Sequence, residues 1–202
     1  DTANPSASAQ RQLYRFLREA RERAPQLDIV VIAGNHDSPG RLEAPAPLLE
    51  AHGTSVIGNI IRNADGDIEL ERLLVPLRGK DGAIAAWCLA VPFLRPGDVP
   101  RIDTLEEGAD PYLNGIGLLY QQAFALARAK CADGQAIVAM GHCHMVNGES
   151  SNDSERRIVI GGTDALPAGI FDPAIAYAAL GHLHLAQRVG QKEHLRYCGS
   201  PL

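Results

Sequence analysis

Three histidine-containing turns, each directly after a short apolar run, constrain the fold of this chain more than any other feature. The turns are Gly34–Asp37, Gly141–His144 and Gly181–His184, and the runs before them are 28–33, 135–140 and 176–180. Short apolar runs bounded by glycine are typical of buried strands. Ligands bind at the carboxyl ends of the strands in open α/β sheets, and imidazole is the commonest ligand for transition metals. The pattern therefore predicts a metal site, and with it an enzyme.

Length and composition indicate one globular domain. A chain of 202 residues can bury a sizeable core, and 46% hydrophobic and 21% charged residues are ordinary for a soluble protein. No apolar stretch has membrane-spanning length and no signal peptide is visible. The four cysteines lack CxxC spacing, which favours reduced thiols and a cytoplasmic location. Because the chain opens with Asp1 and stops at Leu202 just after a strand-like run, we expect it to be truncated at both ends.

The net charge of −5 argues against binding of nucleic acid through bulk positive charge. The arginines are scattered and form no basic stripe with interleaved aromatic residues. The charge does not exclude a nuclease whose metal ions meet the phosphates.

Apolar periodicity and capping residues predict three helices. The first spans 6–24 with Ser6 or Ser8 as its cap, and the second runs from about 41 to 52, with prolines near its start. The third opens at Asp110, followed by proline in the preferred order. The expected apolar faces are Leu13, Phe16, Leu17 and Ala20 on the first helix and Leu113, Ile116, Leu119, Tyr120, Ala123 and Leu126 on the third.

Further strands are expected around these helices. They lie at 73–77, 83–94, 157–160, 186–189 and 194–198, with a tight turn at 79–82, a polar loop at 147–155 and a final hairpin across 190–193. Strands alternate with helices early and pair locally late. This order predicts an α/β domain with a mixed sheet layered between helices.

The residue types in the three turns suit metal chemistry. The amide oxygen of Asn35 is a hard neutral ligand that suits Mn or Mg, and His36 beside it can act as an acid. His182 and His184, two positions apart on an extended segment, would point the same way and bind one metal or two adjacent metals. His142 follows its glycine as His182 does, whereas His144 is expected to be a loop residue or an outer partner of the site.

These motifs, in this order, resemble the calcineurin-like metallophosphoesterases, and the surrounding segments are similar to the bacterial SbcD nuclease subunits. The similar segments are 33–39, 90–95, 154–157, 179–184 and 196–201, and the resemblance runs through essentially the whole chain. It implies a layered α-β-β-α sandwich with mixed sheets over residues 1–202, whose first strand would precede residue 1.

The resemblance also implies roles for single residues. Asn35, His142 and His182 match the ligands of one metal, and His184 matches a ligand of the other. His36 matches the catalytic histidine that helps the 3′ oxygen leave. Asp1 looks like the last carboxylate of a Gly-Asp-x-x-Asp motif, which orients that histidine.

The resemblance further implies two divalent ions, Mn²⁺ or else Mg²⁺, about 3.5–4 Å apart, that clamp a DNA phosphodiester. It implies 3′→5′ exonuclease and endonuclease action, a coiled-coil ATPase partner of the SbcC type and a homodimer, without a membrane. The Asp-x-His motif and the metal-bridging Asp would precede residue 1, so we expect this chain to bind at most one metal. The alternatives are a phosphomonoesterase or cyclic-nucleotide phosphodiesterase of the same superfamily, and a metal-free interaction module.

Overall fold

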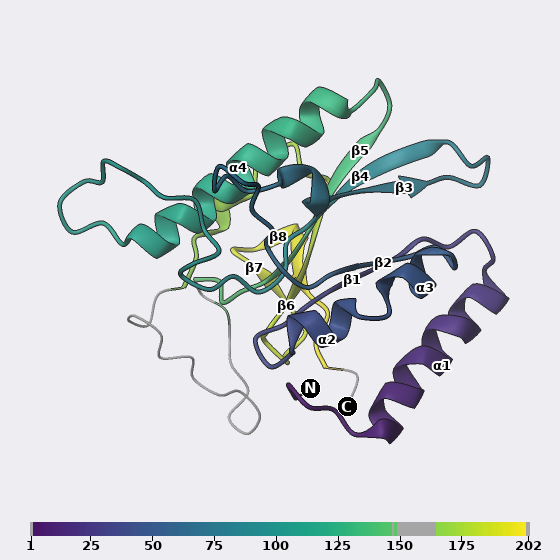
Figure 1. Cartoon of the computed structure of the whole chain (residues 1–202). Helices are drawn as coiled ribbons and strands as arrows, with labels where there is room; N and C mark the ends of the chain where they lie inside the picture. The colour runs from purple at the N-terminus through teal and green to yellow at the C-terminus, as the bar shows by residue number, and fades with distance from the viewer. Residues whose placement is uncertain (1, 147, 149–164, 201–202) are drawn as a thin grey trace.

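Two β-sheets and their flanking helices make up the computed structural model, which describes residues 2–146, 148 and 165–200 (Figure 1). The helices are α1 (Ala7–Arg23), α2 (Pro39–Glu43), α3 (Ala46–Glu50) and α4 (Pro111–Lys130), with short 3₁₀ helices η1 (Leu70–Leu73) and η2 (Ala168–Ile170). The strands are β1 (Ile29–Ile32), β2 (Thr54–Ile57), β3 (Leu74–Arg78), β4 (Ile84–Ala90), β5 (Ala136–His142), β6 (Tyr177–Gly181), β7 (Gln187–Val189) and β8 (Lys192–Tyr197).

The larger sheet has six strands in the order β3-β4-β5-β6-β8-β7. Its four inner strands run parallel, and β3 and β7 are antiparallel to their neighbours at the two edges. The smaller sheet consists of β1 and β2 in parallel, and β1 contacts β4 and β5. Helix α4 lies on one side of the large sheet and α1 to α3 lie on the side of the small sheet (Figure 1). The expected layered α/β fold with a mixed sheet is confirmed.

The side chains of the large sheet alternate between two apolar layers. On β4, Leu89 faces the core shared with α4, whereas Cys88 and Ala90 face the core shared with β1 and β2. The same alternation places Ile137 of β5 against α4 and Val138 against the small sheet. A strand buried on both faces reads as a nearly continuous apolar run, which is why β4 and β5 are visible in the sequence.

Local sequence signals explain the best-predicted elements. Asp110 caps α4 by accepting hydrogen bonds from the amides of Tyr112 (2.7 Å) and Leu113 (3.2 Å), and Pro111 occupies the first turn, where no amide is needed. At the β7–β8 turn, Gly190 and Gln191 both have positive φ, 55° and 57°, as a tight two-residue hairpin turn requires.

Two predictions of secondary structure were wrong. The single helix expected at 41–52 is two short helices, α2 and α3, because Pro45 and Pro47 interrupt the hydrogen-bond ladder. The strand expected at 83–94 ends at Ala90, and the chain then continues as a loop. Strand β2 was not predicted, although its Thr-Ser-Val-Ile run follows Gly53, whose φ is 68°.

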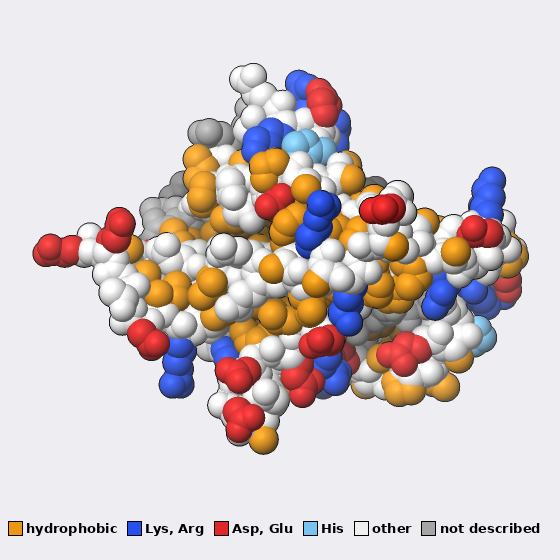
Figure 2. Space-filling model, turned by 90° about the horizontal axis from the view of Figure 1, so that it is seen from above, with side chains coloured by type: hydrophobic (Ala, Val, Ile, Leu, Met, Phe, Trp, Pro, Cys, Tyr) orange, Lys and Arg blue, Asp and Glu red, His pale blue; other side chains and the backbone are white. Residues whose placement is uncertain are grey.

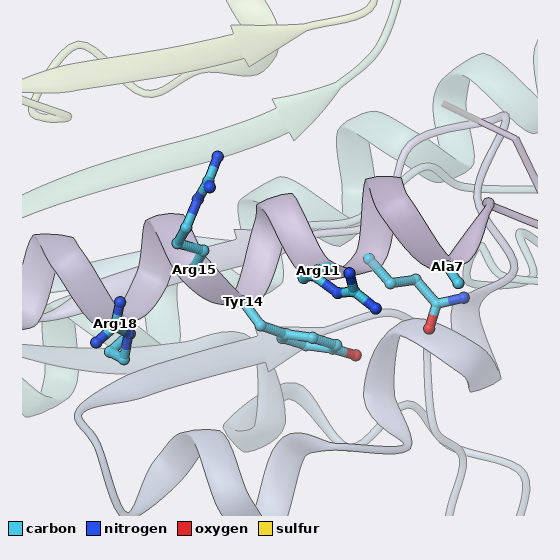
Figure 3. A pocket seen from close by; sticks show the side chains of 6 residues that line it. Ala7, Arg11, Tyr14, Arg15 and Arg18 are labelled. Carbon is cyan, nitrogen blue, oxygen red and sulfur yellow. The ribbon is translucent and has the colours of Figure 1, made fainter.

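Helix α1 buries only part of its expected apolar face. Ser6 caps it by accepting from the amide of Ala9 (3.2 Å), and Leu17 is buried, but Leu13 and Phe16 are 36% and 64% exposed. A shallow groove runs along the helix, lined by residues of α1 alone: Ala7, Gln10, Arg11, Tyr14, Arg15 and Arg18 (Figure 3). The groove contains none of the candidate site residues.

The surface agrees with the charge pattern of the sequence. On the face shown in Figure 2, basic and acidic side chains alternate with apolar ones and form no continuous basic band in the part of the chain that the structure describes. Within that part, no helix is both long and apolar enough to cross a membrane. The predicted strand at 157–160, most of the loop at 147–155 and Asp1 lie outside the described residues.

Candidate metal centre

The turn after β1 presents Asn35 and His36 at its corner. The amide of Asp37 donates to the carbonyl of Gly34 (3.2 Å), which closes a four-residue turn. The carboxylate of Asp37 accepts from the amide of Gly34 (2.7 Å) and locks the same turn from its other side. Asp37 is therefore used in shaping the turn, and the two side chains between these anchors are half-buried.

Asn35 meets His142 across the two sheets. The Oδ1 atom of Asn35 lies 2.7 Å from Nε2 of His142, which is the last residue of β5. An amide oxygen only accepts, so this contact needs the His142 tautomer with its proton on Nε2, whereas metal binding at Nε2 needs that proton removed. The 107 positions between the two residues are bridged because β1 contacts β5 and both strands end at the same edge.

His182 lies beside His142. The parallel register of β5 and β6 places Gly181 opposite His142, and the imidazole of His182 follows with its ring centroid 5.4 Å from that of His142. His182 has a φ of 105°, so the segment from His182 to His184 is not the extended one that we expected. The backbone turns out of β6 at this residue, a conformation that is strained for a side chain other than glycine and that clusters at functional sites.

Two glycines make room for the His142 ring. A Cβ on Gly34 would lie 2.7 Å from Cε1 of His142, and a Cβ on Gly181 would lie 2.9 Å from its Nδ1. Both distances are shorter than nonbonded contacts allow. The glycines that precede Asn35 and His182 in the sequence motifs are thus needed for the close approach of the imidazole.

The electrostatic environment keeps His142 neutral. Burial, and after it the neighbouring His182, His36 and His184, together lower its pKa to about 4. A neutral imidazole has the lone pair that a metal requires.

His184 follows His182 by two positions in the loop after β6. His184 is exposed, and its carbonyl accepts from the amide of Ser200 (2.9 Å). The exposed His144 ring has its centroid 6.0 Å from that of His182, so it is close to the cluster although we gave it only an outer role. Asp1 lies outside the described residues.

Three residues near the cluster were missed in the sequence. The ring of Phe93 meets the edge of His142 with centroids 6.1 Å apart, and the guanidinium of Arg95 lies 5.7 Å from the Phe93 centroid. Tyr197, the last residue of β8, lies beneath the loop after His142. All three stand in segments that carry the family resemblance, and this was the only sequence signal for them.

Tyr197 holds the loop that follows His142. Its buried hydroxyl donates to the carbonyl of Cys143 (2.5 Å) and accepts from the amide of Met145 (3.1 Å). Tyr197→Phe is expected to destabilise the fold by about 1–3 kcal/mol, because both backbone groups lose a buried partner. Urea unfolding measures this loss, with Tyr14→Phe on the exposed face of α1 as a control. Equal unfolding midpoints for the two variants would contradict the assignment.

Two of the gathered donors lie about as close together as two ligands of one divalent ion. Two atoms bound at about 2.1 Å and 90° to each other lie about 3 Å apart, close to the 2.7 Å between Asn35 Oδ1 and His142 Nε2. An amide oxygen with imidazoles suits a metal such as Mn²⁺. Within residues 2–146, 148 and 165–200, no group of three or more His, Cys, Asp or Glu side chains is arranged to hold a metal. The donors described at the cluster are the Asn35 amide oxygen and the imidazoles.

Comparison with known proteins identifies relatives of this chain. It matches no protein family model. It is 41% identical along its whole length to the SbcD subunit of the nuclease SbcCD from Rhodobacter capsulatus, and it covers 49% of that protein. This chain is a homologue of the SbcD nuclease subunit. The SbcD proteins of Escherichia coli K12 and Bacillus subtilis are 36% and 35% identical, again over all of this chain and 48% and 49% of their own lengths. The SbcD homologue thus spans about half the length of the curated relatives that it matches.

Proposed function

We propose that residues 1–202 form the metallophosphoesterase domain of a nuclease subunit that hydrolyses DNA phosphodiester bonds in an SbcCD-type complex. The proposal includes 3′→5′ exonuclease and endonuclease action in DNA repair and recombination. The observation that carries it is the contact between Asn35 and His142 beside His182, in a chain homologous to SbcD along its whole length.

The proposed roles follow the family pattern residue by residue. Asn35, His142 and His182 hold one metal ion, and the 2.7 Å contact and the adjacent rings support this set. His184 serves the second ion. His36 acts on the leaving 3′ oxygen as an acid or hydrogen-bond donor, and Asp1 orients His36.

The cofactors in this proposal are two divalent ions, with Mn²⁺ preferred over Mg²⁺. When bound, the ions stabilise the charge that develops on the phosphate during in-line attack. The chain supplies the rigid frame for them. The turn at Gly34–Asp37 fixes Asn35, the glycines at 34 and 181 seat His142, and Tyr197 holds the loop behind it.

The partners in this proposal are DNA and an ATPase subunit of the SbcC type with a long coiled coil, as suggested by the name of the relatives, which makes them part of an SbcCD nuclease. We also propose a homodimer for the full-length protein and a cytoplasmic location. All four cysteines are free thiols, which is consistent with a reducing compartment.

A substrate panel tests the reaction class. The full-length protein with Mn²⁺ is expected to cleave linear duplex DNA and to leave nitrophenyl phosphate and cyclic nucleotides largely intact. Preferential hydrolysis of either small substrate would favour a phosphomonoesterase or a cyclic-nucleotide phosphodiesterase. Elemental analysis showing no bound metal after incubation with Mn²⁺ would favour a metal-free interaction module.

A further inference from the structure

The loop after β4 forms a rigid wall beside the candidate metal centre. The amide of Phe93 donates to the carbonyl of Ala33 (2.8 Å), which ties the loop to the strand end just before Asn35. The hydroxyl of Tyr112 on α4 donates to the carbonyl of Leu94 (2.7 Å) from the other side. The amide of Arg95 donates to the carboxylate of Asp98 (2.7 Å). Three successive residues are thus each held by a hydrogen bond.

A row of contacting side chains leads from the centre to the surface, and its two rings, Phe93 and His142, are nearly perpendicular. The Phe93 ring contacts the edge of the His142 ring, and the Arg95 guanidinium lies over Phe93. A single aromatic ring therefore separates this cation from a proposed metal ligand. Contact with a ring face orients a guanidinium without neutralising its charge. Arg95 is exposed, and none of the ion pairs found among the described residues includes it.

The position and charge of Arg95 suit a substrate with several backbone phosphates. The donors described at the centre are an amide oxygen and imidazoles, which supply no fixed positive charge for the neighbouring phosphates of a strand. A guanidinium presents several N–H donors in a plane and binds phosphate oxygens in pairs. We propose that Arg95 binds a backbone phosphate next to the one being cleaved, and so makes the site selective for polynucleotides over small phosphodiesters. This inference rests on the proposed nuclease function.

The test compares two substrates in the full-length protein with Mn²⁺. Linear DNA contains further phosphates next to the one that is cleaved. Bis(p-nitrophenyl) phosphate contains only the phosphate that is cleaved. Arg95→Ala is expected to lower the ratio of kcat/KM for DNA to kcat/KM for the small diester about tenfold. The slope of log Kd for DNA against log salt concentration should fall by about one, because one phosphate contact is lost. Arg95→Lys should recover part of the ratio, since it keeps the charge.

Arg78→Ala is the matched control. It removes the same charge at the far end of the β3–β4 hairpin, away from the loop that carries Arg95, and should leave the ratio unchanged. An Arg95→Ala ratio equal to that of the unsubstituted protein, or an equal loss on both substrates, would overturn the role of Arg95. Failure of the unsubstituted protein to cleave DNA would instead overturn the proposed function, and this inference with it.

Discussion

Replacement of His36 by alanine in the full-length protein is expected to abolish nuclease activity and to leave the metal content close to that of the unsubstituted protein. His36 shares the turn of Asn35 but makes none of the contacts that join Asn35, His142 and His182. Loss of a general acid typically costs about 10²–10⁴ in rate. Single-turnover cleavage of duplex DNA and elemental analysis of the same samples measure the two effects.

His182→Ala is the paired variant for this prediction. Its imidazole lies next to His142, so its loss should lower both the metal content and the activity. His52→Ala, an exposed histidine after α3, should change neither quantity. Equal loss of metal in the His36 and His182 variants would assign His36 to metal binding and contradict its role on the leaving group.

The 202 residues by themselves are expected to bind at most one Mn²⁺, weakly, and to show no cleavage of linear DNA. The donors that the described residues gather are imidazoles and one amide, none of which carries a negative charge. Two divalent ions held close together repel each other strongly, and neutral ligands do not offset that charge. Titration calorimetry gives the stoichiometry, and a nuclease assay in Mn²⁺ gives the activity.

His142→Ala in the same 202 residues separates site binding from adventitious binding. The single binding event should disappear, because this ring touches both Asn35 and His182. Binding that survives in the variant would place the ion elsewhere. Robust Mn²⁺-dependent cleavage of DNA by these residues would overturn the ligand assignment, since the site would be complete without a carboxylate.

Local patterns in the sequence determined the elements that deliver the site. Strands β1, β5 and β6 read as apolar runs followed by glycine and histidine, because most of their residues are buried or half-buried and each strand stops where the chain turns. Helix α4 was recognisable from Asp110 and Pro111, since capping depends only on neighbouring residues. From these signals the meeting of Asn35 with His142 at one sheet edge could be expected before any coordinates.

The other features of the site depend on contacts between residues that are far apart in the sequence. The sequence could not show that the His182 backbone leaves the extended conformation, because that geometry arises where Gly181 lies against the His142 ring. Nor could it show that Phe93 lies between His142 and Arg95, or that the Tyr197 hydroxyl donates to the carbonyl of Cys143, 54 positions earlier. Strand periodicity records only which face of a sheet a side chain occupies. The partner that a side chain meets depends on the order and register of strands, and these are set only when the two sheets pack.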